Sequence, residues 1–343
     1  MKKISSFLLL LMLALNLMAA EAKTVRHYVF FGMDRETLPT AKAFFEMPEF
    51  EGAQISYSWR RLEPGKDEYD FRFIREDLEL LNSKGKKLFV QIQDVSFSDR
   101  WVHVPRYLVR DPEYNGGADR QYQFGPDGEL GEAPKPAGWM ARRWDPAVRE
   151  RFRKLLIALG KEFDGKIEGI NLAETSCVVG DTGKFFPKGY THAAYRDGII
   201  ANMKALREAF RKSTVIVYAN FMPGDWLPTQ DRGYLRSVYA AAKVLKVGVG
   251  GPDVFPYKPG QMNNSYHLIH DIAEKVPVGM AVQDGNYEHV NPKTNNRVTA
   301  REIHDFATGY LRADYIFWGI EEPYFSQQTI PFLSQRSVTP KTR

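Results

Sequence analysis

Acidic and amide side chains stand at or just after the carboxyl ends of most of the short apolar segments of this chain. In chain order they are Asp34, Asp94, Glu174, Asn220, Asp253, Gln283, Asp284 and Glu321. If the segments are parallel strands, their carboxyl ends meet at one face of the fold, so these side chains would lie together. A carboxylic acid that protonates a leaving oxygen, beside a second carboxylate that attacks or activates water, is what hydrolysis of a glycosidic bond requires. The pattern therefore predicts a site for carbohydrate chemistry.

Aromatic and basic side chains accompany the acids. Planar indole and phenol rings can stack on the C–H faces of sugars, and an Arg can bind an anionic sugar or orient a carboxylate. We therefore expect a substrate-binding set of eight residues, namely Trp59, Arg60, Asp94, Asn220, Asp253, Tyr257, Gln283 and Trp318.

The elements that must position these residues follow a repeating pattern. Segments rich in Val, Ile, Phe and Tyr alternate with amphipathic segments, as in parallel sheets whose strands are joined by helices. We predict eight strands at 27–34, 53–59, 87–94, 167–174, 214–221, 247–255, 278–284 and 315–319. The clearest helices are expected at 71–83, 146–163, 193–212, 233–245, 265–275 and 299–311.

Eight such units predict an α/β fold, a (β/α)8 TIM barrel, with a single domain over 23–343. A doubly wound open sheet is the alternative, but the first strand is followed by Gly32-Met33-Asp34 and not by a Gly-rich phosphate turn. The connection 95–144, between the third strand and its helix, is unusually long for a loop. We expect its aromatic residues to wall one side of the barrel mouth, and they include Trp101, Tyr107, Tyr114, Tyr122, Trp139 and Trp144.

One motif resembles a known family. Residues 55–71 read ISYSWRRLEPGKDEYDF, which is similar to the second-strand signature of clan A glycoside hydrolases. Trp144-Asp145-Pro146 before a helix and the strand 167–174 fit the same pattern. The resemblance implies a barrel glycosidase in which Glu174, at the end of the fourth strand, is the general acid/base. It also implies that Trp318 is the eighth-strand Trp that floors the sugar site.

Two positions depart from this family. Ala173 stands where the family usually has Asn, and Gln283 stands where the resemblance places the nucleophilic Glu. Asp284 and Glu321 are therefore equal candidates for the second catalytic carboxylate, while Asp94 and Asp253 stay open. Carboxyls about 5 to 5.5 Å apart would imply retention of configuration, and about 6.5 to 9.5 Å inversion. Sequence fixes neither distance.

The functional hypothesis is a glycoside hydrolase that acts on a polysaccharide or oligosaccharide. A catalytically inactive carbohydrate-binding barrel and a uronate polysaccharide lyase, with Tyr257 or a His as base near Arg60, are the alternatives. We expect no metal site and no cofactor, because His267 and His270 lack the Glu and third ligand of a zinc site. Cys177 has no His placed by sequence to activate it.

The first 22 residues have the pattern of a signal peptide. Lys2 and Lys3 precede an apolar run, and the small residues 19–22 follow. We expect cleavage near Ala22, a periplasmic or secreted protein, and no stable membrane insertion afterwards. The formal charge of +5 is spread over 47 basic and 42 acidic residues, so we expect no nucleic-acid partner. Oligomeric state is left open.

Overall fold

The computed structural model describes residues 24–338, so the expected signal peptide at 1–22 lies outside the described residues. Eight parallel strands close into a barrel in the order β1-β11-β10-β9-β8-β7-β3-β2. Each of the eight predicted strand segments overlaps one of them, although β1 and β2 begin one and three residues earlier than predicted, and the predicted (β/α)8 fold is confirmed. The barrel strands are β1 (Arg26–Phe30), β2 (Phe50–Ser58), β3 (Lys87–Gln93), β7 (Gly169–Leu172), β8 (Thr214–Tyr218), β9 (Gly248–Gly251), β10 (Val278–Val282) and β11 (Tyr315–Gly319).

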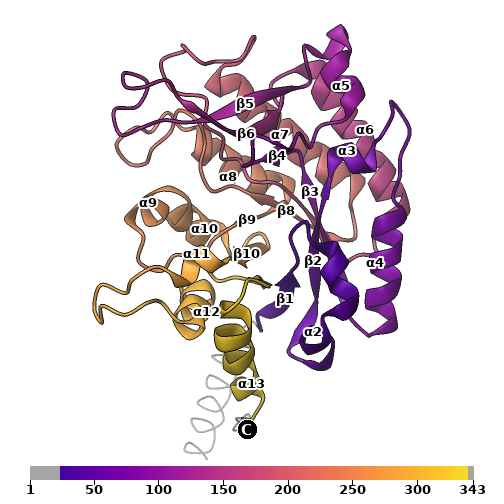
Figure 1. Ribbon diagram of the computed structural model, residues 1–343, viewed down its shortest axis with the longest axis vertical. Helices are drawn as coiled ribbons and strands as arrows, with labels where there is room; N and C mark the ends of the chain where they lie inside the picture. The colour runs from indigo at the N-terminus through magenta and orange to yellow at the C-terminus, as the bar shows by residue number, and fades with distance from the viewer. Residues whose placement is uncertain (1–23, 339–343) are drawn as a thin grey trace, which may run out of the picture.

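Helices surround the barrel, as Figure 1 shows. The longer ones are α4 (Arg72–Ser83), α6 (Pro146–Phe163), α7 (His192–Ala209), α8 (Tyr234–Leu245), α10 (His267–Ile272), α12 (Ala300–Gly309) and α13 (Ile330–Val338). Short α-helices are α2 (Lys42–Glu46), α3 (Trp59–Leu62), α5 (Arg106–Arg110), α9 (Pro259–Gln261) and α11 (Asp284–Tyr287). Short segments of 3-10 helix lie at Arg35–Thr40 and Pro112–Tyr114, and short segments of π-helix lie at Met262–Tyr266 and Phe325–Thr329.

Helix boundaries follow from local capping. The Asp145 carboxylate accepts the Ala147 N–H at 2.8 Å, and Pro146 opens α6 at a position that needs no N–H donor. Thr299 and Glu302 form a reciprocal capping box at the start of α12. Both caps are formed by residues within one turn of the helix start.

The barrel interior is filled mainly by aromatic rings. Tyr28, Phe89, Tyr315 and Phe317 pack together with Ile216, Tyr218 and Ala281 as one buried cluster. A Cβ on Gly169 would stand 2.5 Å from the Phe89 ring, so only glycine leaves room for that side chain. The second and larger apolar cluster lies between the strands and the helices. The barrel is therefore packed along its axis and is not an open pore.

The long connection after β3 contains structure that the sequence did not predict. Strands β4 (Val95–Ser96), β5 (Ala118–Gln123) and β6 (Lys135–Ala141) form an antiparallel sheet in the order β4-β6-β5. Figure 1 shows this sheet above the barrel strands, in purple. Because β5 and β6 pair across a loop and β4 pairs with β6 over more than 40 residues, the pairing is not encoded in any local motif.

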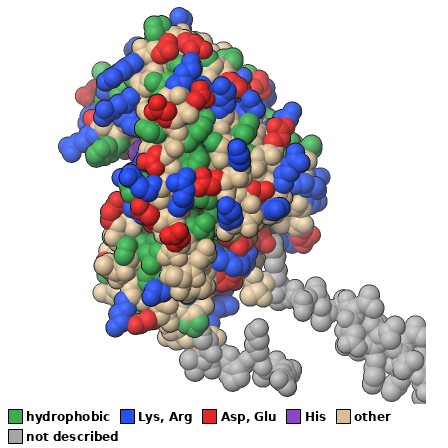
Figure 2. Space-filling model, turned by 90° about the vertical axis from the view of Figure 1, so that its right-hand side faces the viewer, with side chains coloured by type: hydrophobic (Ala, Val, Ile, Leu, Met, Phe, Trp, Pro, Cys, Tyr) green, Lys and Arg blue, Asp and Glu red, His purple; other side chains and the backbone are tan. Residues whose placement is uncertain are grey.

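Charge is mixed on the face that carries α4 and α6. Figure 2 shows Lys and Arg side chains interspersed with Asp and Glu over this face, with no continuous basic stripe. Within residues 24–338, no helix is both long and apolar enough to cross a membrane.

Candidate active site

A cavity of about 310 Å³ opens at the carboxyl ends of the barrel strands. Glu174, two residues beyond β7, lines it together with Gln283, which follows β10. The connection after β3 closes one side with the exposed rings of Phe97 and Trp101 and with His103. Further lining residues are Phe30, Met33, Gln91, Gln93, Val95, Ser96, Ser98, Tyr218, Pro252 and Ala281. An acid, amides and aromatic rings thus converge on one concave surface, as in a ligand site.

Glu174 is held in a defined position. The Asn220 side-chain amide donates a 2.6 Å hydrogen bond to Glu174 Oε2. Arg143 donates a 2.9 Å hydrogen bond to the backbone carbonyl of the same residue. Burial raises the pKa of Glu174 to about 7, and the negative charge of Asp253 acts in the same direction, against the Asn220 hydrogen bond and the Arg143 charge. A carboxyl with this pKa is partly protonated at neutral pH and can give a proton to a substrate.

Asp253 is the carboxylate whose charge acts on Glu174. It follows β9, and its Oδ1 accepts a 2.8 Å hydrogen bond from the Asn286 amide. Burial raises the pKa of Asp253, and the nearby charge of Asp284 adds to the effect. The adjacent Pro252 lines the cavity. The sequence placed Asp253 in the substrate-binding set, whereas the structure pairs it electrostatically with the candidate acid.

The two candidates for the second carboxylate lie together but apart from Glu174. Asp284 is exposed as the first residue of α11. Burial raises the pKa of Glu321, and the charges of Asp284 and Asp34 raise it further. Asp253, Asp284 and Glu321 are all absent from the residues that line the cavity with Glu174, but of the three only Asp253 has a charge that acts on the pKa of Glu174. Asp253 is therefore the carboxylate that is electrostatically coupled to Glu174.

Trp59 and Trp318 are buried in the core. Both have 0% of their surface exposed. The Trp59 indole N–H donates to Glu63 at 2.7 Å, and that of Trp318 donates to His27 at 3.1 Å. The expectation that these rings stack on a sugar is corrected by this placement. Trp59 fails the expectation because it opens helix α3 rather than ending the strand.

Asp94 and Arg60 serve the scaffold of the site. Both Asp94 oxygens accept hydrogen bonds from Arg143, one of them at 2.8 Å, and the pair is buried. Arg60 donates to the carbonyl of Val104 at 2.8 Å, so it holds the connection that carries His103 and does not pair with Glu174. Arg143 was missed by sequence reasoning, since nothing local in Arg142-Arg143-Trp144 indicates that it reaches Asp94 and Glu174.

The remaining expected residues divide between the cavity and its surroundings. Gln283 lines the cavity, and its amide donates to the Pro252 carbonyl at 2.9 Å. Tyr257 bonds to Glu302 and Asn291 instead and is not a lining residue. Of the loop aromatics expected at the mouth, Trp101 lines the cavity, whereas Tyr114 and Trp144 are buried. Phe97 and His103 were missed, and only a knowledge of the β4-β6-β5 sheet could have selected them.

Two further observations concern a thiol and possible metal ligands. Burial raises the pKa of the Cys177 thiol to about 12, so it stays protonated at neutral pH. In the part of the chain that the structure describes, no group of three or more His, Cys, Asp or Glu side chains is placed to hold a metal ion.

Several solved structures resemble this chain to different degrees. A mutant of xylanase A from P. fluorescens subsp. cellulosa in complex with xylopentaose has a TM-score of 0.51 at 13% identity, over 87% of both chains. A family 39 glycoside hydrolase from Bacteroides cellulosilyticus WH2 gives 0.49 at 13% identity, over 87% of this chain but only 56% of its own length. An exo-beta-1,4-mannosidase from Opitutaceae bacterium strain TAV5 gives 0.43 at 14% identity, over 92% and 56%. No protein-family model and no curated protein sequence matches the chain.

The likeness to xylanase A shows the class of fold. The chain has the (β/α)8 barrel found in glycoside hydrolases, as the motif at 55–71 led us to expect. At 13% identity the likeness does not extend to substrate or mechanism.

Proposed function

We propose that the protein is an exported glycoside hydrolase that cleaves a polysaccharide or oligosaccharide, with Glu174 as the proton donor. The observation that carries the proposal is the position of Glu174, which lines the mouth cavity with its pKa raised to about 7 and its carboxylate fixed by Asn220. Export rests on the pattern of residues 1–22, and it implies a periplasmic or secreted enzyme.

We further propose Asp253 as the second carboxylate, with Asp284 and Glu321 as its rivals. Asp253 is partly buried, and its charge acts on the pKa of Glu174. In this assignment Glu174 protonates the leaving oxygen while Asp253 attacks the anomeric carbon or activates water.

The structure gives the lyase alternative less support. A lyase that acts on uronates needs a cationic or metal group to neutralise the sugar carboxylate, and the described residues lining the mouth cavity include no Lys or Arg. His103 lines the cavity and burial lowers its pKa, so it is neutral and available as a hydrogen-bond partner for a sugar.

The test is an assay of the wild-type protein and Glu174→Gln on a panel of neutral and uronate polysaccharides, with new reducing ends as the readout. Loss of a general acid costs about 10²- to 10⁴-fold in rate, and we expect a loss in that range. Glu79→Gln, an exposed change on α4, is the matched control and should keep full activity. Undiminished cleavage by Glu174→Gln would falsify the assignment. Product absorbance from a new double bond would indicate a lyase, and binding without product would indicate an inactive barrel.

A further inference from the structure

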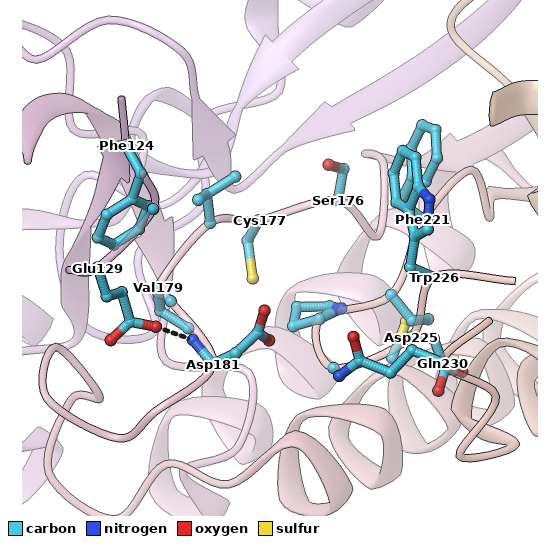
Figure 3. A pocket seen from close by; sticks show the side chains of 16 residues that line it. Phe124, Glu129, Ser176, Cys177, Val179, Asp181, Phe221, Asp225, Trp226 and Gln230 are labelled. Atoms are coloured by element: carbon cyan, nitrogen blue, oxygen red, sulfur yellow. Dashed lines mark hydrogen bonds between the residues drawn. The ribbon is translucent and has the colours of Figure 1, made fainter. Parts of the chain in front are cut away.

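A second cavity of about 540 Å³ adjoins the mouth cavity. Its walls come from the loop after β7, the loop after β8 and the tip of the β5–β6 hairpin (Figure 3). Asn220 lies at the boundary between the two cavities: it donates to Glu174, which lines the first, and accepts from the N–H of Ser176, which lines the second. Tyr218 lines the first cavity, and Phe221, three residues later, lines the second. Glu174, which lines the first cavity, is therefore linked through Asn220 to Ser176, which lines the second.

An exposed indole is fixed on the wall of this cavity. Trp226 has 51% of its surface exposed, and its ring lies parallel to that of Phe221, with centroids 5.6 Å apart and an interplanar angle of 6°. Figure 3 shows the two rings stacked at one side of the cavity. The backbone of Trp226 exchanges two 2.8 Å hydrogen bonds with Gln230, which closes a tight loop. An indole held in this way can stack on the face of a sugar at little cost in side-chain entropy.

The polar part of the lining favours an uncharged ligand. Glu129, Asp181 and Gln230 offer acceptors for sugar hydroxyl groups, and the described lining includes no Lys or Arg. Glu129 also fastens the hairpin tip to the loop after β7, because it accepts the N–H groups of Asp181 and Thr182. The dashed line in Figure 3 marks one of these bonds. The carboxylates would repel an anionic chain such as a polyuronate.

We propose that the second cavity binds the leaving-group side of a neutral polysaccharide, with Trp226 as its stacking platform, so that the chain is cut internally. This inference rests on the proposed hydrolase function. The side is assigned from the proposed role of Asp253: this residue lines neither cavity, but Pro252 before it lines the mouth cavity, so we assign the sugar under attack to the mouth cavity. Glu174 would then protonate the oxygen that links the sugars in the two cavities.

The experiment compares substrate lengths in the full-length protein. Xylo-, cello- and manno-pentaose and the matching disaccharides are assayed with the wild type, Trp226→Ala and Leu130→Ala. Leu130, which is 93% exposed near the hairpin tip and does not line the cavity, is the control. On the pentasaccharide that the wild type cleaves, we expect Trp226→Ala to lower kcat/KM at least tenfold more than on the disaccharide. Leu130→Ala should change neither value.

Calorimetry on Glu174→Gln separates the two proposals. If no glycan is cut but a neutral pentasaccharide binds and Trp226→Ala weakens it tenfold or more, the binding site stands and the hydrolase function fails. If glycans are cut but Trp226→Ala affects both lengths equally, the function stands and this inference is overturned. Binding of tetragalacturonate as tight as that of the neutral pentasaccharide would also overturn it.

Discussion

The Asn220 side chain joins the candidate acid to the loop that follows it. Its amide N–H lies 2.6 Å from Glu174 Oε2, and its oxygen accepts the N–H of Ser176 at 3.3 Å. A donor to a carboxylate stabilises the ionised form and lowers its pKa, so this bond restrains the upward shift that burial causes. Asn220 therefore holds the Glu174 carboxylate in position and opposes the rise in its pKa that burial causes.

Asn220→Ala should move the alkaline limb of the pH–rate profile upward. Without the donor the pKa of Glu174 rises above about 7, the protonated acid persists to higher pH, and the rate falls because the carboxyl is less well placed. The measurement is kcat/KM on the cleaved glycan from pH 5 to pH 9. Asn296→Ala, at an exposed position, is the control. An alkaline limb that stays in place or moves to lower pH would refute this role.

Three variants distinguish the candidates for the second carboxylate. We expect Asp253→Asn to reduce kcat by at least about 100-fold, as loss of a catalytic carboxylate does, and to lower the pKa of Glu174 because a nearby negative charge is removed. The new amide can still accept the Asn286 hydrogen bond, so folding should persist. Asp284→Asn and Glu321→Gln should each retain most activity. If Glu321→Gln or Asp284→Asn is instead the inactive variant, the second role passes to that residue.

The strands could be predicted because their signal is local. Each barrel strand is an apolar run buried on both sides, and alternation with amphipathic helices determines the fold class. The helix starts at Pro146 and Ala300 depend on residues within one turn, so the sequence contains all the information needed. The polar residues that close the strands could be located by the same reasoning.

The direction of each side chain at a strand end could not be predicted. Trp59 turns into the core because helix α3 begins there, and Trp318 points outward to His27 while its neighbour Phe317 fills the barrel. A shift of one residue along a strand turns each side chain to the opposite face, so a small error in register changes which side chains are expected in the site. Asp94 is matched by Arg143, 49 residues away, and no local pattern encodes that pair. The second cavity depends in the same way on contact between the hairpin tip and the loop after β7.

The buried pair of Asp94 and Arg143 should be important for stability. Arg143→Met leaves the Asp94 carboxylate buried without its partner, and breaking such a pair costs about 3–5 kcal/mol. We expect a loss of that size in the free energy of unfolding, measured by urea denaturation at pH 7. Arg100→Met, at an exposed site, should change it by less than about 0.5 kcal/mol.

The double variant tests the physical reason for that loss. Asp94→Asn combined with Arg143→Met removes the uncompensated charge, so it should be more stable than Arg143→Met alone. A double variant that is less stable than the single one would show that packing, and not the ion pair, dominates at this position.

The raised pKa of Glu174 predicts that this carboxyl lowers the free energy of unfolding of the wild-type protein when the carboxyl is ionised. The folded state holds this proton up to a pKa of about 7, whereas the ordinary value for Glu is 4.5. Between these two values the folded state binds more protons than the unfolded state, so the contribution of Glu174 to stability falls as pH rises through this window.

Gln carries no charge to bury. Glu174→Gln should therefore match the wild type near pH 4 and exceed its free energy of unfolding at pH 8 by up to about 3 kcal/mol. Urea denaturation at both pH values checks this, and Glu79→Gln should show no such divergence. A variant less stable than the wild type at pH 8 would contradict this prediction, because it would show that hydrogen bonds and nearby charges offset the cost of burying the ionised Glu174 carboxylate.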